Sequence, residues 1–395
     1  MAGLTGAAPT KFIRDRLTWL GYLSLSTYAF CLYALGPVTA FLRQELHLSY
    51  TLTSWHSALW AIAAILTGLT FDQLTRRLGR RRVFWLAAAT LVIGVILFLV
   101  GYVVAVTLLA AMVLGAGGTF LGSSSVTALA DRHPGSSDRA LVEANVGASV
   151  TAVAVPALLG LLAATVVGWR AGLLVPAVTV VVLYLVYGRE PLPPRAVTST
   201  IPGQLSGEFW RLCFLVALAV AVEFCIVFYG VPLLTAGTGL STPDAAAVMS
   251  LFFAGELAGR LVGARLTRRP GRSPGVMAAA LAVAMTGFLV LWLARFPLLA
   301  AVALFVTGLG VANLYPLSVA LALAAAGGRT DRAMARTQVA LGAAILVAPL
   351  LLGVLSDRVG VLRALTVEPC LMIVAAVALV VIRVADRRPG GPVAA

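Results

Sequence analysis

The stretch DRALVEANVGASVTAVAVPALLGLL at residues 138–162 returns in altered form at residues 331–355 as DRAMARTQVALGAAILVAPLLLGVL. Four residues keep their places under this shift of 193: the pairs are Asp138/Asp331, Arg139/Arg332, Pro156/Pro349 and Gly160/Gly353. LTRRLGR at 74–80 likewise returns as LTRRPGR at 266–272, and AFC at 29–31 returns as EFC at 223–225. The shifts of 193, 192 and 194 agree along the whole chain, so the two halves are copies of one unit.

The repeated stretches are strongly apolar, and so is the rest of the 395-residue chain. It is 61% hydrophobic and only 11% charged, whereas a soluble domain carries about 25% charged residues. Since a membrane-spanning helix needs about 20 apolar residues, the chain contains twelve spans: 17–42, 52–75, 82–104, 105–131, 139–166, 169–188, 209–236, 244–267, 274–295, 297–326, 332–355 and 362–384. The sequence predicts an all-α polytopic membrane protein.

One connection is longer than the others and divides the spans six and six. It reads GREPLPPRAVTSTIPGQLSGE at 188–208 and is rich in proline, serine and threonine. We therefore expect an N-terminal six-helix bundle at 1–188, a cytoplasmic linker at 189–208 and a C-terminal six-helix bundle at 209–395. The duplication predicts that pseudo-two-fold symmetry relates the bundles.

The basic residues predict the orientation of the spans. If both termini are cytoplasmic, 23 of the 29 arginines and lysines lie on the cytoplasmic side, and only Arg43, Arg170, Arg295, Arg358 and Arg363 lie outside. This asymmetry follows the positive-inside rule and accounts for the net charge of +14 without a nucleic-acid partner. We expect a multi-pass protein of the plasma membrane (the inner membrane of a bacterial cell) with cytoplasmic termini, bound to lipid.

Six plus six spans, duplicated halves, a polar central linker and a basic loop after spans two and eight resemble the major facilitator superfamily. The resemblance covers nearly the whole chain. It implies two bundles that face each other across a central cavity, which opens alternately to each side of the membrane. A substrate is then expected near the bilayer midplane, between the halves.

The loop DQLTRRLGRRR at 72–82 looks like the family's signature between spans two and three. The residues that fit it are Arg77, Gly79, Arg80 and Arg81. The family's first glycine falls on Asp72 and its aspartate falls on Arg76, so the charge order differs. The resemblance assigns this loop to gating, with Asp72 as a substitute carboxylate facing a helix N-terminus. The alternative is that these arginines only set the topology.

Few ionisable residues lie deep in the predicted spans. Glu143 is four residues from Arg139 and is expected to pair with it near the inner surface. Glu368 lies about two turns into span twelve from the outer side, close enough to reach the interface; the alternative is a functional role. The deepest group is Glu223 in span seven, with Glu256 and Arg260 in span eight.

Arg260 has two possible partners among these residues. Glu256 and Arg260 are spaced i, i+4 and can neutralise each other on one helix face; the alternative is a cross-helix pair between Arg260 and Glu223. One arginine cannot match two glutamates. A carboxylate without a partner at this depth favours its protonated form, so Glu223 is a candidate for proton coupling or for binding a cation.

Aromatic and amide side chains accompany these charges. They are Tyr28 and Tyr33 in span one, Phe224 and Tyr229 in span seven, and Asn313 and Tyr315 in span ten. Aromatic faces suit a cationic or amphipathic guest. They are equally compatible with packing against lipid or other helices.

The sequence favours a proton-coupled secondary transporter of a small organic molecule. The favoured activity is export of a lipophilic or cationic compound. The alternative is proton-coupled uptake of a small organic nutrient or anion. One proton crossing 100 mV is worth about 2.3 kcal/mol, roughly a fifty-fold concentration ratio. No Gly-x-x-x-x-Gly-Lys-Ser/Thr loop is present for ATP, and no catalytic constellation predicts an enzyme. We expect no cofactor, no metal and a monomeric transporter.

Overall fold

The computed structural model describes residues 12–133, 136–193, 203–267 and 273–386, and the regular elements in these ranges are helices. Twelve helical segments are long and apolar enough to cross a membrane, which confirms the predicted spans. The first six are α1 (Arg16–Glu45), α2 (Tyr50–Leu78), α3 (Arg80–Leu99), α4 (Val104–Arg132), α5 (Ser137–Ala163), and α6 (Leu174–Tyr187) with the 3-10 turn Trp169–Leu173 before it. The others are α7 (Gly207–Thr238), α8 with α9 (Thr242–Val248, Ser250–Leu266), α10 (Ser273–Leu293), α11 with α12 (Pro297–Val311, Leu314–Ala324), α13 (Thr330–Val359), and α14 with α15 (Val361–Ala364, Val367–Asp386).

Two spans that the sequence presents as continuous apolar runs are broken by proline. Pro316 lies in the first turn of α12 and has no N–H to donate to the carbonyl of Ala312, so α11 ends before it. Pro369 acts in the same way at the start of α15, opposite the carbonyl of Leu365. Proline is tolerated in a first helical turn because those N–H groups have no helical partner.

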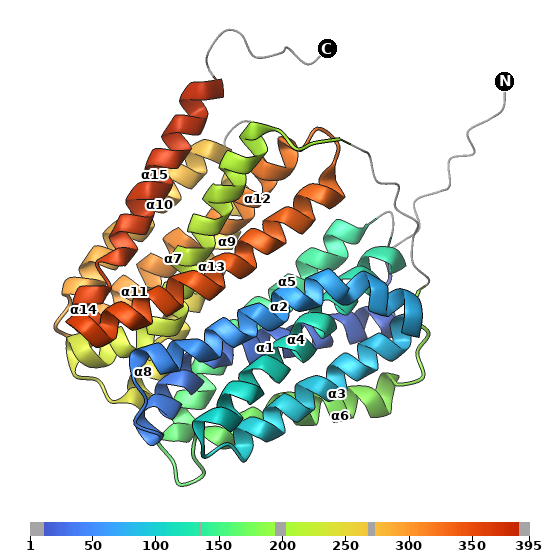
Figure 1. The fold of residues 1–395 in the computed structure, drawn as a ribbon, viewed down its shortest axis with the longest axis horizontal. Helices are drawn as coiled ribbons and strands as arrows, with labels where there is room; N and C mark the ends of the chain where they lie inside the picture. Colours follow the sequence, from blue (N-terminus) through green and yellow to red (C-terminus); the bar gives the residue numbers. More distant parts are fainter. Residues whose placement is uncertain (1–11, 134–135, 194–202, 268–272, 387–395) are drawn as a thin grey trace.

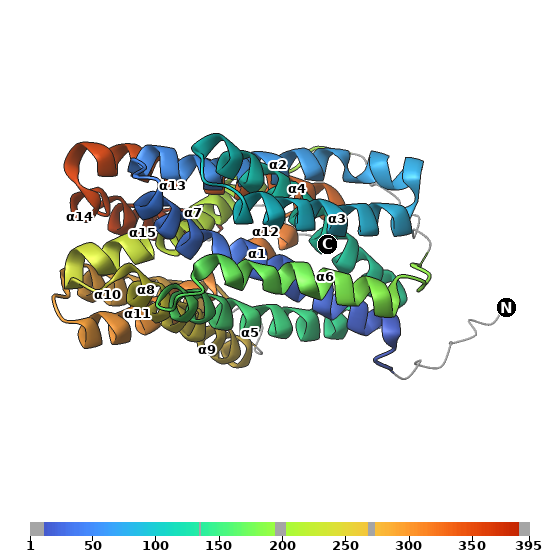
Figure 2. The same cartoon turned by 90° about the horizontal axis from the view of Figure 1, so that it is seen from below.

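The helices form two bundles, α1–α6 and α7–α15, which lie side by side (Figure 1). Figure 2 shows α1 and α7 between the outer helices of the two bundles, and their apolar windows are the most buried of the twelve spans, at 78% and 89%. The predicted linker lies partly outside the described residues, which omit 194–202.

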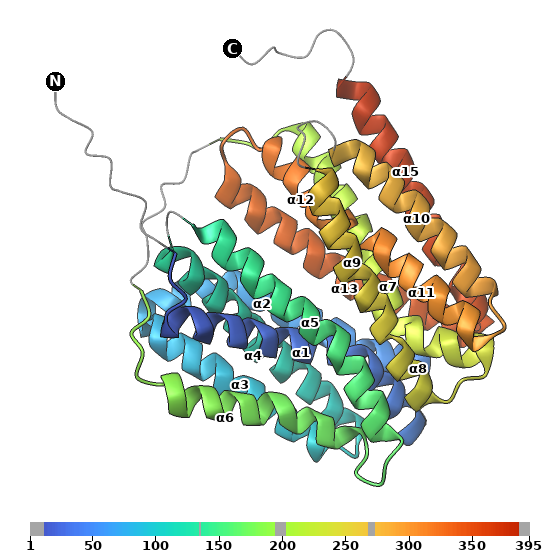
Figure 3. The same cartoon turned by 180° about the vertical axis from the view of Figure 1, so that it is seen from behind.

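The two ends of the helices differ in composition and in packing. We call the end where α2 ends and α3 begins the arginine-rich end, because Arg76, Arg77, Arg80, Arg81 and Arg82 lie there. The other end, where α1 ends and α2 begins, is the opposite end. Helices of the two bundles converge toward the opposite end and diverge toward the arginine-rich end, as the pairs α2/α13 and α5/α9 show (Figures 1 and 3).

Glycines allow the bundles to approach closely where they converge. A Cβ added at Gly36 of α1 would lie 2.3 Å from the carbonyl oxygen of Val227 in α7. One added at Gly160 of α5 would lie 2.5 Å from the carbonyl oxygen of Pro243 in α8. Small residues at these positions let helix backbones touch, as is common between membrane helices.

Candidate functional site: a buried carboxyl and arginine cluster

Two carboxyl groups and one guanidinium meet near the middle of the protein. Glu223 lies midway along α7 and is 7% exposed, and Glu256 of α9 is 2% exposed. Both lie within electrostatic reach of Arg260 in α9 and of Tyr33 in α1. The structure thus brings together the three ionisable residues that the sequence singled out.

Arg260 pairs with Glu256, so the i, i+4 arrangement is the one present. Its Nη2 lies 3.4 Å from Oε2 of Glu256, while Oε1 of Glu256 is buried without a partner among the described residues. Within those residues Glu223 has neither an ion pair nor a hydrogen bond, although it interacts with Arg260 at longer range. One guanidinium therefore serves two buried carboxyls incompletely.

The cluster lies between the two bundles. Nη1 of Arg260 donates to Oγ of Ser149 in α5, 3.0 Å away, so the guanidinium bridges from the C-terminal bundle to the N-terminal one. The Arg260 side chain is nevertheless 37% exposed. This exposed surface lies where α9 of one bundle meets α5 of the other. The sequence analysis missed Ser149; the chain offers many serines and no signal separates this one.

Three of the predicted tyrosines lie at the cluster: Tyr33 and Tyr315 border the charges, and Tyr28 lies beside these two rings. Tyr33 packs edge-on against Phe253 of α9, with ring centroids 4.8 Å apart. Tyr28 covers the glycine face of α4, where a Cβ at Gly122 would lie 3.1 Å from its ring. Tyr315 of α12 interacts electrostatically with Glu223. These three partly buried rings give the cluster an aromatic rim.

The other predicted lining residues lie elsewhere. Phe224 packs against Phe228, one helical turn further on, with 5.8 Å between the ring centroids. It points away from the Glu223 side chain because adjacent residues of a helix point about 100° apart. Tyr229 lies six residues after Glu223 in α7, nearer the opposite end. Its hydroxyl group is hydrogen-bonded to that of Ser54 in α2. Nδ2 of Asn313 donates to the carbonyl of Gly259, 2.7 Å away, and ties the break between α11 and α12 to α9.

A carboxylate joins the bundles at the opposite end. Asp357, in the last turn of α13, accepts the backbone N–H groups of Tyr50 and Thr51 at the start of α2, each at 2.8 Å. The first N–H groups of a helix have no helical partner and carry partial positive charge. The sequence offered one signal that we did not use: an acidic residue near a helix C-terminus is unfavourable unless something compensates for it.

Neighbouring contacts close the same end. The hydroxyl groups of Ser54 in α2 and Tyr229 in α7 lie 2.6 Å apart, and Gln44 of α1 donates to Thr242 of α8. Arg43 stacks over the ring of Tyr50 at 3.7 Å. The Arg43 contact lies within the N-terminal bundle. The other two contacts and the glycine contacts pack the bundles against each other at the opposite end.

The loop that resembles the family signature holds the N-terminal bundle together. Gly79 has φ +82°, a conformation that suits glycine, and it separates α2 from α3. Arg80 pairs with Asp131 of α4 and donates to the carbonyl of Pro193 at 3.0 Å, and Arg81 donates to the carbonyl of Gly188. Asp72 lies exposed on α2 near the arginine-rich end, as do Arg76 and Arg77.

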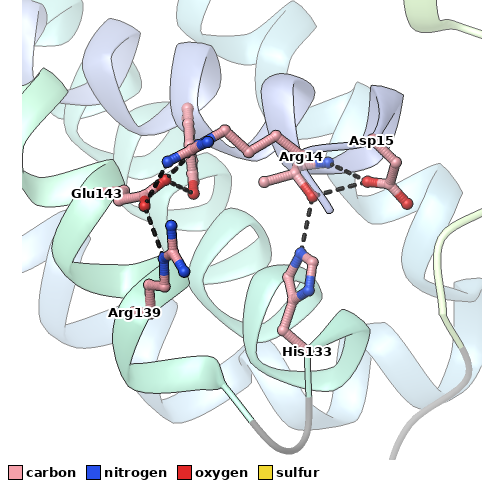
Figure 4. A network of polar contacts seen from close by, with 7 residues as sticks. Arg14, Asp15, His133, Arg139 and Glu143 are labelled. Atoms are coloured by element: carbon pink, nitrogen blue, oxygen red, sulfur yellow. Dashed lines mark hydrogen bonds and ion pairs between the residues drawn. The ribbon is translucent and has the colours of Figure 1, made fainter. Parts of the chain in front are cut away.

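A polar network fixes the start of α1 (Figure 4). Glu143 of α5 accepts from Arg14 at 2.7 Å and from Arg139 at 3.0 Å, which confirms the predicted Arg139 pair. The hydrogen bond to Glu143, and next the negative charge of Glu143, raise the pKa of Arg14. Asp15 caps α1 and pairs with Arg132; burial opposes its ionisation, but the bonds from Thr18 and Arg132 outweigh it and lower the pKa of Asp15.

Glu368 corrects one expectation. It does not reach the interface: it is 1% exposed, in α15, close enough to Cys225 of α7 to interact with it, and neither carboxyl oxygen has a partner in the part of the chain described. Its short side chain points inward because α15 packs against α7 there.

Comparison with known proteins agrees with this architecture. No curated protein matches the sequence significantly. A bacterial homologue of the human lysosomal transporter Spinster, in an inward-facing and occupied conformation, superposes with a TM-score of 0.80 and 15% identity over 96% of this chain and 100% of that one. The nucleoside transporter NupG superposes with a TM-score of 0.70 and 13% identity over 95% of this chain and 100% of that one. The family model for the Major Facilitator Superfamily matches residues 21–233 and 212–395, so the chain belongs to this superfamily of transporters.

Proposed function

We propose that the chain is a proton-coupled secondary transporter of a small organic molecule and that Glu223 carries the coupled proton. Small-molecule transport by alternating access follows from its superfamily. The observation that supports proton coupling is the buried cluster, in which Glu223 and Glu256 share Arg260 between the bundles. Ionisable residues are costly inside a membrane and usually lie on a path for protons or substrate.

Charge balance assigns different roles to the two carboxyls. Arg260 neutralises Glu256 at 3.4 Å, so the pair is close to neutral. Glu223, 7% exposed and without an ion pair among the described residues, then holds a proton in this conformation, because an isolated carboxylate in low dielectric is very costly. When the bundles open to the other side of the membrane and water reaches Glu223, the carboxyl group releases this proton.

The surroundings favour export of a lipophilic or cationic compound. The rings of Tyr33 and Tyr315 border the cluster, with Tyr28 beside them, and offer faces to an apolar or cationic guest. A cation bound at Glu223 would compete with the proton of this carboxyl group. Such competition couples export of the cation to entry of a proton.

A second candidate function is uptake of a small organic anion with protons. The observation that favours it is the Arg260 side chain, which is 37% exposed at the boundary between the bundles. A guanidinium binds carboxylate and phosphate groups well through parallel hydrogen bonds. An anion bound there would separate Arg260 from Glu256, which would then take up a proton.

We further propose that the structure is the state closed to the outside. The contacts of Asp357, Tyr229 and Gly160 close the opposite end, and the positive-inside rule puts the arginine-rich end in the cytoplasm. The bundles, 1–188 and 209–395, would rock about the cluster as units. A single chain in the plasma membrane, with both termini cytoplasmic, suffices for this cycle.

Transport by purified protein in liposomes tests the function. A panel of lipophilic cations, neutral compounds and organic anions is offered with and without a pH gradient, at zero membrane potential. Accumulation that requires the gradient is the expected result. Equal rates with and without the gradient for every transported compound would contradict proton coupling but leave transport intact.

A further inference from the structure

A cavity of about 930 Å³ opens at the arginine-rich end, away from the carboxyl cluster. It lies between the end of α2, the start of α3 and the end of α6. The described residues that line it belong to the N-terminal bundle, except for Leu192 and Pro193 in the first part of the linker. The transport cycle proposed above gives this cavity no role.

One wall of the cavity is strongly basic. Arg76, Arg80, Arg81 and Arg82 line it, and none of the described residues that line it is acidic. Arg80 and Arg81 are held by protein groups. Arg76 and Arg82 are exposed and, among the described residues, make no hydrogen bond or ion pair. Two guanidinium groups are therefore free to bind an anion.

Further donors lie at the wall of the cavity. Thr75 lines the cavity, is only 9% exposed, and its buried hydroxyl has no partner within the described residues. Gly79 precedes α3 and provides no side-chain cap, so the first N–H groups of this 20-residue helix are uncapped. A buried hydroxyl without a partner costs free energy, and an anion that accepts from it would recover that cost.

The other wall is apolar and faces the membrane. Trp85 of α3 packs edge-on against Tyr184 of α6, with ring centroids 5.1 Å apart, and both line the cavity. Leu86 and Tyr184 are 54% and 58% exposed on the outer surface of the bundle. Tryptophan and tyrosine mark the level of lipid headgroups, so the cavity opens at the depth where headgroups lie.

We propose that this cavity binds the headgroup of an anionic phospholipid from the leaflet on the arginine-rich side. The lipid phosphate accepts from Arg76, Arg82 and the first N–H groups of α3, and Thr75 donates to a headgroup oxygen. The acyl chains lie along Leu86 and Tyr184. A free inorganic anion would leave the apolar wall unused, and a zwitterionic lipid would place its own cation against the arginines. Basic pockets between membrane helices on the cytoplasmic side are typical sites for such lipids.

The test measures lipid binding by the full-length protein, freed of lipid in detergent. Native mass spectrometry with phosphatidylglycerol and with phosphatidylcholine of the same chains gives the two affinities. The double variant Arg76→Gln/Arg82→Gln should bind phosphatidylglycerol about 30-fold more weakly, at about 1 kcal/mol for each arginine. The control Arg77→Gln/Arg358→Gln removes two charges outside the cavity and should stay within about two-fold of wild type.

Thr75→Val serves as a nearly isosteric second variant. It should lower the affinity for phosphatidylglycerol and leave that for phosphatidylcholine unchanged, and it keeps the proposal testable if the double variant does not fold. Equal affinities of the wild type for the two lipids would overturn the proposal. So would equal losses in the double variant and its control. Displacement of phosphatidylglycerol by millimolar inorganic phosphate would instead identify a site for soluble anions.

Discussion

Asp357 at the end of α13 accepts the backbone N–H of Tyr50 at the start of α2, across the boundary between the bundles. In the superfamily signature that the loop at 72–82 resembles, a gating aspartate lies between spans two and three; Arg76 stands at that position here. The contact between a carboxylate and a helix N-terminus is found instead at the opposite end. We therefore expect the conformational equilibrium of the two bundles to depend on Asp357.

Asp357→Asn should shift the protein toward opening at the opposite end. The amide lacks the charge that favours the α2 N-terminus and accepts through one oxygen only, a loss of about 1 kcal/mol, or roughly five-fold in the equilibrium. Spin labels on Ala164→Cys and Ser241→Cys, read by electron–electron double resonance, report the separation of the bundles there. Glu45→Gln is the matched control, since Glu45 pairs with Arg170 within one bundle. An unchanged distance distribution in Asp357→Asn would show that the contact of Asp357 with the start of α2 does not hold the bundles together.

Arg80→Gln should lower stability without changing substrate recognition. Arg80 and Asp131 are 17% and 19% exposed, so the change leaves a partly buried carboxylate unpaired, at a cost of about 1–2 kcal/mol. Membrane yield and thermal unfolding in detergent measure the loss, and substrate affinity should stay near that of wild type. Arg77→Gln, an exposed neighbour, should have little effect. A large loss of affinity with normal turnover would place the arginine in the substrate path instead.

Both termini should lie in the cytoplasm. In a background without native cysteines, Ser136→Cys and Ser206→Cys should resist a membrane-impermeant thiol reagent applied to sealed cells, and Ser241→Cys should react. The expectation follows from the distribution of arginines. Labelling at position 206 from outside would reverse the orientation of every helix.

Asp15→Ala should destabilise the protein at neutral pH by about 1 kcal/mol through loss of the α1 cap. The folded pKa of Asp15 is lowered, so its contribution is present above its unfolded pKa and is lost as the pH falls through the folded value, below about pH 4. The difference in unfolding temperature between wild type and variant should therefore shrink as the pH falls through that range. A difference that stays constant down to pH 3 would show that the charge of Asp15 does not contribute.

The length of the apolar runs was enough to predict the twelve spans, because lipid leaves helices as the available structure for such segments. The same reasoning located Glu223, Glu256 and Arg260, since charge is conspicuous among apolar residues. It did not locate Ser149, whose role depends on how α5 lies against α9. It also grouped Tyr229 with the residues of the cluster, because the residue type does not show which neighbouring helix each face of α7 contacts.

Asp357 shows the same limit at the opposite end. The sequence placed it in a short connection between two spans, and only packing of α13 along α2 brings it to Tyr50 and Thr51. Contacts between elements some 300 residues apart depend on tertiary geometry. The sequence shows that Arg76 stands where the family signature has an aspartate. Only the structure shows that a carboxylate, Asp357, contacts a helix N-terminus at the other end of the bundles.

The central claim is that Glu223 carries the coupled proton. Glutamine at this position keeps the size and hydrogen bonding of the side chain but cannot ionise. The measurement is transport by Glu223→Gln in liposomes, as accumulation driven by a pH gradient and as exchange without one, beside Glu256→Gln. The account predicts that Glu223→Gln abolishes gradient-driven accumulation while exchange of a neutral substrate survives, or that binding itself fails if the substrate is a cation. Glu256→Gln should cost expression or stability more than coupling. Accumulation by Glu223→Gln at the wild-type rate, with unchanged dependence on pH, would contradict the account and leave Glu223 a buried polar contact.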